Sequence, residues 1–131
     1  MTTVLVIDDS PSEMAKFRDM LSKNNFQVLE ASNGEQGYQM AVDHLPDVIL
    51  MDVVMPEMNG FQATRKITRG KTTAHIPIIM ISTKNQETDR VWGKRQGAKE
   101  YITKPIDDSR LVQRIRTVIV LIVTSRGFIY M

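Results

Sequence analysis

A chain of 131 residues without cysteine is long enough to bury one hydrophobic core, and it excludes a disulfide-stapled fold and a thiolate metal site. The longest late apolar run covers only the six residues 118–123, and no basic leader precedes the first apolar run, so we expect neither a membrane-spanning helix nor a signal peptide. We therefore expect one cytoplasmic domain without membrane insertion.

The charges are unevenly distributed, although the net charge is only +2. Residues 1–66 carry 10 acidic and 5 basic side chains, whereas residues 67–131 carry 5 and 12. A basic half can mark a nucleic-acid-binding face, but these basic residues are scattered singly with few aromatic residues among them. We interpret most of them as solvated helix faces and predict no nucleic-acid partner. The residues in question are Lys84, Arg90, Lys94, Arg95, Lys99, Arg110, Arg114 and Arg116.

Short apolar runs alternate five times with helical patterns along the chain. The apolar runs predict strands over residues 3–8, 26–31, 47–52, 77–82 and 99–103. The helical patterns predict helices over residues 11–23, 34–43, 60–69, 86–95 and 108–122. The first, third and fourth strands are continuous runs of Val, Ile, Leu and Met, which is typical of central strands covered on both faces. The alternation predicts a parallel sheet with right-handed crossovers, and therefore a three-layer α/β fold.

The first helix has the clearest start signal. Ser10 is a good N-cap residue, Pro11 fits the first helical position, and Glu13 completes a capping box.

Three carboxylates follow two of the central strands, because Asp8 and Asp9 end the first strand and Asp52 ends the third. The carboxyl ends of parallel strands lie at one edge of a sheet, so these side chains should converge and raise one another's pKa. A hard divalent cation relieves this repulsion, and Mg²⁺ is usually held by one or two carboxylates, water and a phosphoryl oxygen. The simpler alternative is that Asp8 or Asp9 only caps the following helix, although Ser10 already fits that position.

The last two strands deliver complementary groups to the same edge. Ser82 and Thr83 follow the fourth strand, and Lys104 follows the fifth, where Pro105 stops the strand and is compatible with a cis peptide. Hydroxyl and ammonium groups beside a carboxylate and Mg²⁺ form a suitable binding site for a phosphoryl group. Taken singly, Ser or Thr at a strand end is more often turn chemistry, and a lone Lys is usually solvated.

Together these motifs resemble the receiver domain of bacterial two-component response regulators. The resemblance covers residues 3 to about 120 and rests on motifs in the family's order and spacing. It implies a CheY-like, flavodoxin-like (βα)5 fold with strand order 2-1-3-4-5. The motifs are Asp8-Asp9, Asp52 with Met55-Pro56 and Gly60, Ser82-Thr83, Tyr101 and Lys104-Pro105.

The resemblance implies a role for each of these carboxylates. Asp52 would be the phosphoacceptor, which takes a phosphoryl group from a phosphohistidine on a partner histidine kinase. Asp9, Asp52 and the main-chain carbonyl of Val54 would ligate Mg²⁺, and Asp8 would help through the metal's water shell.

It also implies a switch. Lys104 would pair with Asp52 and then with the phosphoryl oxygens, the hydroxyls of Ser82 and Thr83 would lie at the phosphoryl site, and Tyr101 would swing inward behind Ser82. Phosphorylation adds charge and three strong acceptors, which favours this arrangement. The face formed by the fourth helix, fifth strand and fifth helix would then change for a downstream protein, and the chain would be a monomer or a phosphorylation-dependent dimer.

Two positions match sites that govern the approach of water to the phosphoaspartate in this family. Val54 brings no polar group to orient water, and Lys84 is placed to contact the phosphate. We therefore expect slow self-dephosphorylation. The alternative is that Val54 is only an apolar residue at a strand end.

The stretch around Trp92, together with residues 101–105, is similar to the PilH-like group, which are single-domain regulators of the chemosensory pathway for type IV pili and twitching motility. Trp92 either contributes to the output face or packs against the sheet. The regulator either carries a signal or serves as a phosphate sink. Residues 121–131 form an apolar C-terminal tail that departs from the family, and no function is assigned to it.

Other function classes fit less well. A haloacid-dehalogenase-type phosphatase needs a second acid two residues after its aspartate, where this chain has Val54. A flavodoxin-like cofactor module needs a phosphate loop after the first strand, where Asp8 and Asp9 would repel a phosphate. The roughly 11 residues beyond the receiver cannot form a helix-turn-helix. We expect no enzyme activity beyond the chain's own phosphorylation and dephosphorylation.

Overall fold

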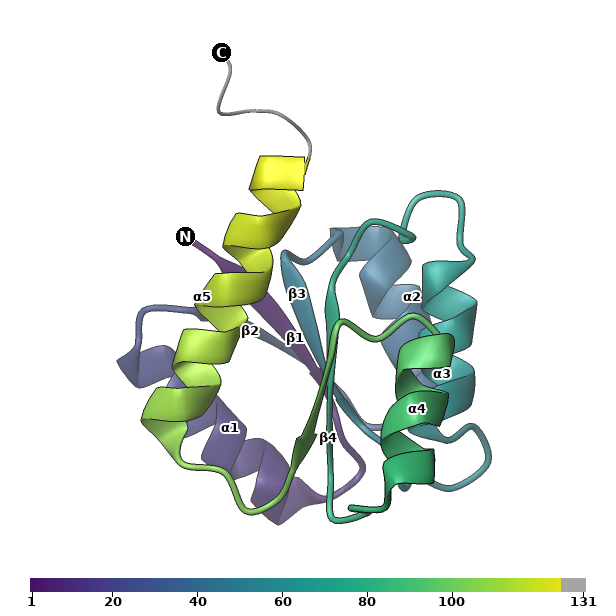
Figure 1. The fold of residues 1–131 in the computed structure, drawn as a ribbon. Coiled ribbons are helices and arrows are strands. Elements are labelled where there is room, and N and C mark those ends of the chain that lie inside the picture. The colour runs from purple at the N-terminus through teal and green to yellow at the C-terminus, as the bar shows by residue number, and fades with distance from the viewer. Residues whose placement is uncertain (126–131) are drawn as a thin grey trace.

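The computed structural model describes the backbone of residues 1–125 and the side chains of residues 1–121. Strands and helices alternate along this part of the chain (Figure 1). The strands are β1 (Thr3–Ile7), β2 (Gln27–Ala31), β3 (Val48–Asp52), β4 (Ile78–Ser82) and β5 (Glu100–Thr103). The helices are α1 (Pro11–Lys23), α2 (Gly34–His44), α3 (Gly60–Thr68), α4 (Glu87–Arg95) and α5 (Asp108–Ser125). Every element predicted from the sequence is present.

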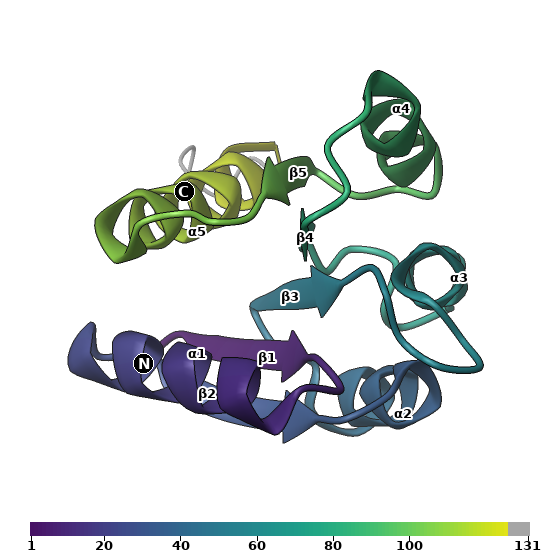
Figure 2. The same ribbon diagram turned by 90° about the horizontal axis from the view of Figure 1, so that it is seen from below.

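The strands form a parallel sheet in the order β2-β1-β3-β4-β5. Helices α1 and α5 cover one face of the sheet, and α2, α3 and α4 cover the other (Figure 2). This arrangement confirms the three-layer α/β fold and the strand order implied by the family resemblance. The three strands with continuous apolar runs are central, as predicted, and β5 is an edge strand.

The central strands contribute to a separate core on each side of the sheet, because successive side chains of a strand point to opposite faces. In β3, Ile49 and Met51 share a core with apolar residues of α2 and α3. Val48 and Leu50 share the other core with residues of α1 and α5. All four side chains are buried, so β3 is held on both faces and fixes the position of Asp52 at its end.

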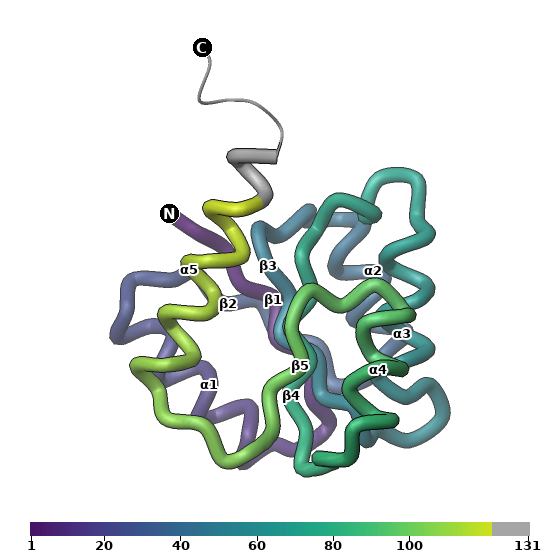
Figure 3. The backbone as a smooth tube through the Cα atoms, in the orientation of Figure 1, coloured from purple at the N-terminus to yellow at the C-terminus, as the bar shows by residue number. Residues whose placement is uncertain are grey.

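The element boundaries differ from the prediction in two informative places. β1 ends at Ile7 rather than Asp8, although the Asp8 backbone N–H still donates to the Ala31 carbonyl at 3.1 Å. Helix α5, which lies on the same side of the sheet as α1 (Figure 3), continues to Ser125 rather than 122 and so enters the predicted tail. The remainder of that tail, residues 126–131, lies outside the described residues.

The start of α1 is only partly as predicted. Ser10 is the N-cap, and its hydroxyl accepts a hydrogen bond from the Glu13 backbone N–H at 3.3 Å. The Ser10 backbone N–H, however, donates to Asp8 Oδ1 at 2.9 Å. In a capping box the Glu13 side chain would accept a hydrogen bond from that N–H, so the predicted box is wrong. The Ser10 N–H instead holds the Asp8 side chain.

No helix in residues 1–125 is long and apolar enough to cross a membrane.

Candidate functional site

The three strand-end carboxylates converge at one edge of the sheet. One oxygen atom from each of Asp8, Asp9 and Asp52 lies within 4.8 Å of the others. Asp8 is buried, with 3% of its surface exposed, whereas Asp9 is exposed and the Asp52 side chain is 12% exposed. The cluster is therefore rigid at its base and open at Asp9, so that an ion could enter from solvent.

Lys104 reaches the same cluster from the neighbouring strands. Its Nζ lies 3.7 Å from Asp52 Oδ1 and 3.8 Å from Asp8 Oδ2. Pairing with β4 continues past the end of β5, because the Lys104 backbone N–H donates to the Ser82 carbonyl at 2.8 Å. The Lys104–Pro105 peptide is cis, as the sequence allowed. The structure thus places Lys104 Nζ beside two of the carboxylates, and Ser82 at the end of the neighbouring strand β4.

One ammonium group does not compensate this much negative charge. Burial, followed by the charge of Asp8, raises the pKa of Asp52 to about 6. Burial also raises the pKa of Asp8, whose buried Oδ2 makes no hydrogen bond within the described residues. Hard oxygen atoms and unbalanced charge suit Mg²⁺. The residues present therefore fit the predicted ion.

The loop after β3 is held tightly against the strand end. The Gly60 backbone N–H, at the first position of α3, donates to the Val53 carbonyl at 2.8 Å. A Cβ atom at Gly60 would lie 2.2 Å from the Asp52 carbonyl oxygen and 2.7 Å from Val53 Cα. Only glycine allows this approach. Val54, two residues after Asp52 in this loop, is 56% exposed.

The residues after β4 divide into buried and exposed groups. Ser82 is fully buried, and its Oγ accepts a hydrogen bond from the Lys84 backbone N–H at 3.1 Å. Thr83 and Lys84 are exposed, and neither side chain forms a hydrogen bond or ion pair within residues 1–121. Tyr101 already lies inward, with 4% of its surface exposed, and its hydroxyl donates to the Lys84 carbonyl at 2.9 Å.

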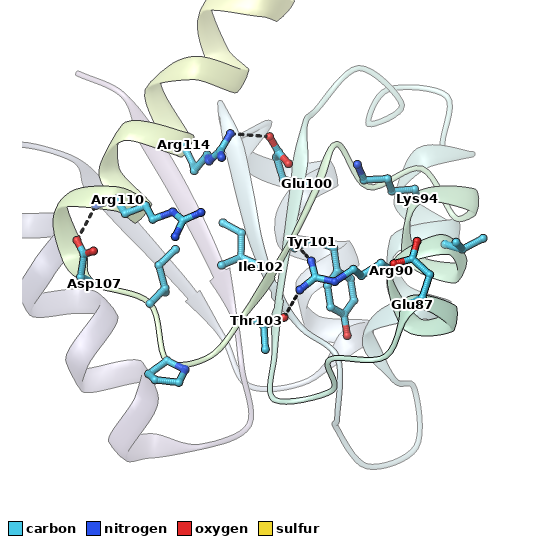
Figure 4. Close-up of a pocket in the computed structure, with 13 residues that line it drawn as sticks. Glu87, Arg90, Lys94, Glu100, Tyr101, Ile102, Thr103, Asp107, Arg110 and Arg114 are labelled. Atoms are coloured by element: carbon cyan, nitrogen blue, oxygen red, sulfur yellow. Dashed lines mark hydrogen bonds and ion pairs between the residues drawn. The ribbon is translucent and has the colours of Figure 1, made fainter.

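An open groove of about 540 Å³ lies between α4, β5 and α5 (Figure 4). We predicted a solvated helix face for Arg90, but its side chain crosses from α4 to β5 in this groove. Its Nη1 donates to the Tyr101 carbonyl at 3.1 Å and its Nη2 to the Thr103 hydroxyl at 2.6 Å. Across the groove, Arg114 pairs with Glu100 at 3.4 Å. No local sequence signal joins these residues, because the contacts depend on how α4 and α5 pack beside an edge strand.

Trp92 lies on α4 and is 48% exposed. This exposure disfavours the alternative in which its ring packs against the sheet.

The chain is similar to known proteins both in sequence and in structure. The model of the response regulator receiver domain matches residues 4–116. Protein PilH of Pseudomonas aeruginosa PAO1 is 53% identical over 119 residues, which cover 91% of this chain and 98% of PilH. The solved structure of chemotaxis protein CheY4 from Vibrio cholerae matches with a TM-score of 0.85 and 29% identity, over 90% of this chain and 98% of that one.

The receiver domain of the sensor histidine kinase PA1611 from Pseudomonas aeruginosa PAO1 is also similar. It matches with a TM-score of 0.84 and 26% identity, over 90% of this chain and 97% of that one. That structure contains a magnesium ion coordinated in its active-site cleft.

Proposed function

The chain belongs to the response regulator receiver domain family, and on this premise we propose that it is a signalling switch operated by phosphorylation of Asp52. The observation that carries the proposal is the position of Lys104 Nζ, 3.7 Å from Asp52 Oδ1 at an edge where three carboxylates meet. The partner would be a histidine kinase that presents a phosphohistidine.

Phosphoryl transfer would use Asp52 as the nucleophile. An Asp52 carboxylate oxygen forms a bond to phosphorus while the P–N bond of the phosphohistidine breaks. The electron pair of that bond stays on the imidazole nitrogen, which is neutral once protonated. The pKa of Asp52 is raised to about 6 in the metal-free protein, and a cation held beside this carboxylate would favour its reactive, ionised form.

The surrounding residues would neutralise and position the phosphoryl group. Mg²⁺, held by Asp9, Asp52 and the Val54 carbonyl and by Asp8 through water, would supply positive charge for the phosphoryl oxygens. Lys104 would move its ion pair from the Asp52 carboxylate to one of those oxygens. The Ser82 hydroxyl, with Thr83 beside it, would donate to another.

The output would be a changed α4-β5-α5 face that a downstream protein recognises in the cytoplasm. Similarity to PilH over 98% of its length supports a role in the control of type IV pili and twitching motility. The chain would act as a monomer or as a phosphorylation-dependent dimer. The second candidate, a phosphate sink, requires rapid loss of the phosphoryl group, which the exposed apolar side chain of Val54 disfavours.

The central test is phosphorylation by a small donor. Incubation with Mg²⁺ and acetyl phosphate should add the mass of one phosphoryl group to the intact protein. Asp52→Asn should add none, because an amide oxygen is a poor nucleophile. The absence of any gain in the unsubstituted protein, or a gain that survives Asp52→Asn, would contradict the proposal.

Val54→Asn should shorten the lifetime of the phosphoryl group. The new amide can orient a water molecule toward phosphorus, and a single net hydrogen bond of about 1 kcal/mol corresponds to roughly a fivefold change in rate. The measurement is the loss of phosphoryl mass after removal of the donor. Val120→Asn provides a matched control, because Val120 is 61% exposed and lies on α5. Equal lifetimes for Val54→Asn and the unsubstituted protein would show that Val54 does not limit hydrolysis.

A further inference from the structure

The contacts of Arg90 form the outer end of a continuous connection to the carboxylate edge. Its guanidinium donates a hydrogen bond to the Tyr101 carbonyl on the outer side of the edge strand β5. The guanidinium carbon also lies 5.6 Å from the centre of the Tyr101 ring. A second N–H bonds Thr103, two residues further along β5. Figure 4 shows the guanidinium between α4 and β5, beside the Tyr101 ring. Arg90 therefore holds both the backbone and the ring of Tyr101.

Helix α4 is also shaped to fit this ring. A Cβ atom at Gly93 would lie 3.0 Å from Tyr101 Cδ2 and 2.8 Å from the Met80 sulfur. The missing side chain at Gly93 lets the helix lie against the ring, while Arg90 on the preceding turn covers it. Tyr101 is thus enclosed by α4, with 4% of its surface exposed.

The enclosed tyrosine in turn fixes the loop after β4. Its hydroxyl donates to the Lys84 carbonyl at 2.9 Å, and the backbone N–H of Lys84 donates to Ser82 Oγ at 3.1 Å. This second bond uses an Oγ lone pair, and the Ser82 hydroxyl also interacts with the Tyr101 side chain. The position of Tyr101 therefore sets the orientation from which the Ser82 hydroxyl would turn to donate to a phosphoryl oxygen.

We propose that Arg90 is a positioning residue for the phosphoryl site, and that it acts through Tyr101 and the Lys84 backbone to orient the Ser82 hydroxyl. The inference rests on the proposed function of Asp52. Because Arg90 lines the groove on the outer face, the same contacts couple that face to the site. Coupling between two binding events is reciprocal, so an acidic group that draws Arg90 away from Tyr101 would weaken phosphoryl binding.

The test uses beryllium fluoride in excess Mg²⁺ as the phosphoryl mimic, with its affinity measured from the backbone amide NMR signals of residues 82–84. Arg90→Met keeps the aliphatic stem and removes the donors, and it should weaken binding roughly fivefold, the equivalent of one net hydrogen bond. Arg90→Lys keeps the positive charge but cannot donate to both acceptors at once. Its affinity for the mimic should lie between those of the unsubstituted protein and Arg90→Met.

Arg95→Met is the matched control. Arg95 is an exposed arginine in the last turn of α4, and its side chain makes no hydrogen bond or ion pair within residues 1–121. Arg95→Met should bind the mimic as the unsubstituted protein does. Thermal unfolding of each variant checks that the folded state is retained.

A double-mutant cycle separates positioning from a merely structural effect. Tyr101→Phe removes the bond to Lys84, so adding Arg90→Met to Tyr101→Phe should cost much less affinity than Arg90→Met alone. Equal affinity for Arg90→Met and the unsubstituted protein, or strictly additive losses, would overturn the inference while the proposed function stands. Failure of the unsubstituted protein to bind the mimic would overturn both.

Discussion

Asp52→Asn is expected to stabilise the metal-free protein at pH 7.5, with a rise in the free energy of unfolding of up to about 3 kcal/mol. In the folded chain the pKa of Asp52 is raised from its usual 3.8 to about 6, chiefly because the carboxylate is buried and next because Asp8 lies beside it. Each pH unit between the two values corresponds to about 1.36 kcal/mol. The folded protein therefore bears the full cost of ionising Asp52 above pH 6.

Because the pKa of Asp52 is raised on folding, the stability gained by Asp52→Asn should depend on pH. Between about pH 4 and 6 the unfolded chain loses this proton while the folded chain keeps it, so the stability of the unsubstituted protein falls as pH rises. Below pH 4 both states hold the proton, and the advantage of Asp52→Asn disappears. Urea unfolding in EDTA at pH 4 and 7.5 measures the difference.

Two further measurements make this expectation specific. Glu57→Gln removes an exposed carboxylate from the loop after β3, and it should leave the stability nearly unchanged at both pH values. Mg²⁺ should stabilise the unsubstituted protein at pH 7.5 and stabilise Asp52→Asn much less, because a bound ion favours the folded state by mass action. An equal gain from Asp52→Asn at pH 4 and 7.5 would contradict an electrostatic origin.

The fold and the carboxylate cluster could be predicted from sequence because their signals are local. Each strand is a short apolar run, and Asp8, Asp52 and Ser82 come directly at or after strand ends. Parallel strands then bring those ends together without any further information. The prediction of Mg²⁺ chemistry at this edge depended only on which residue types gather there.

The contacts that the sequence did not reveal depend on tertiary packing. Arg90 resembles the other scattered basic residues until β5 is placed at the edge of the sheet beside α4, where the Tyr101 carbonyl has no neighbouring strand. The Ser10 N–H could have bonded either Glu13 or Asp8, and the position of Asp8 at the end of a buried strand decided the outcome. Local sequence patterns do not specify either of these hydrogen bonds.

Gly60→Ala is expected to destabilise the fold and to weaken Mg²⁺ binding, although alanine is the better helix former. In an exposed helical position the change would stabilise by about 1 kcal/mol. Here the new Cβ would lie 2.2 Å from the Asp52 carbonyl oxygen and 2.7 Å from Val53 Cα, and backbone atoms cannot rotate away as a flexible side chain can. Overpacking of this kind usually costs about 1–3 kcal/mol, and occasionally more.

The displaced backbone is the segment that carries Val54, whose carbonyl is a proposed Mg²⁺ ligand. The ion's affinity should therefore fall even at temperatures where Gly60→Ala remains folded, which an Mg²⁺ titration of the folded protein would measure. Gly34→Ala is the matched control, because Gly34 opens α2 as Gly60 opens α3, and its new Cβ would come no closer than 3.0 Å to Met58. Gly34→Ala should cost less stability and leave Mg²⁺ affinity unchanged. If Gly60→Ala behaved in the same way, the close approach of α3 would not be what positions the Val54 carbonyl.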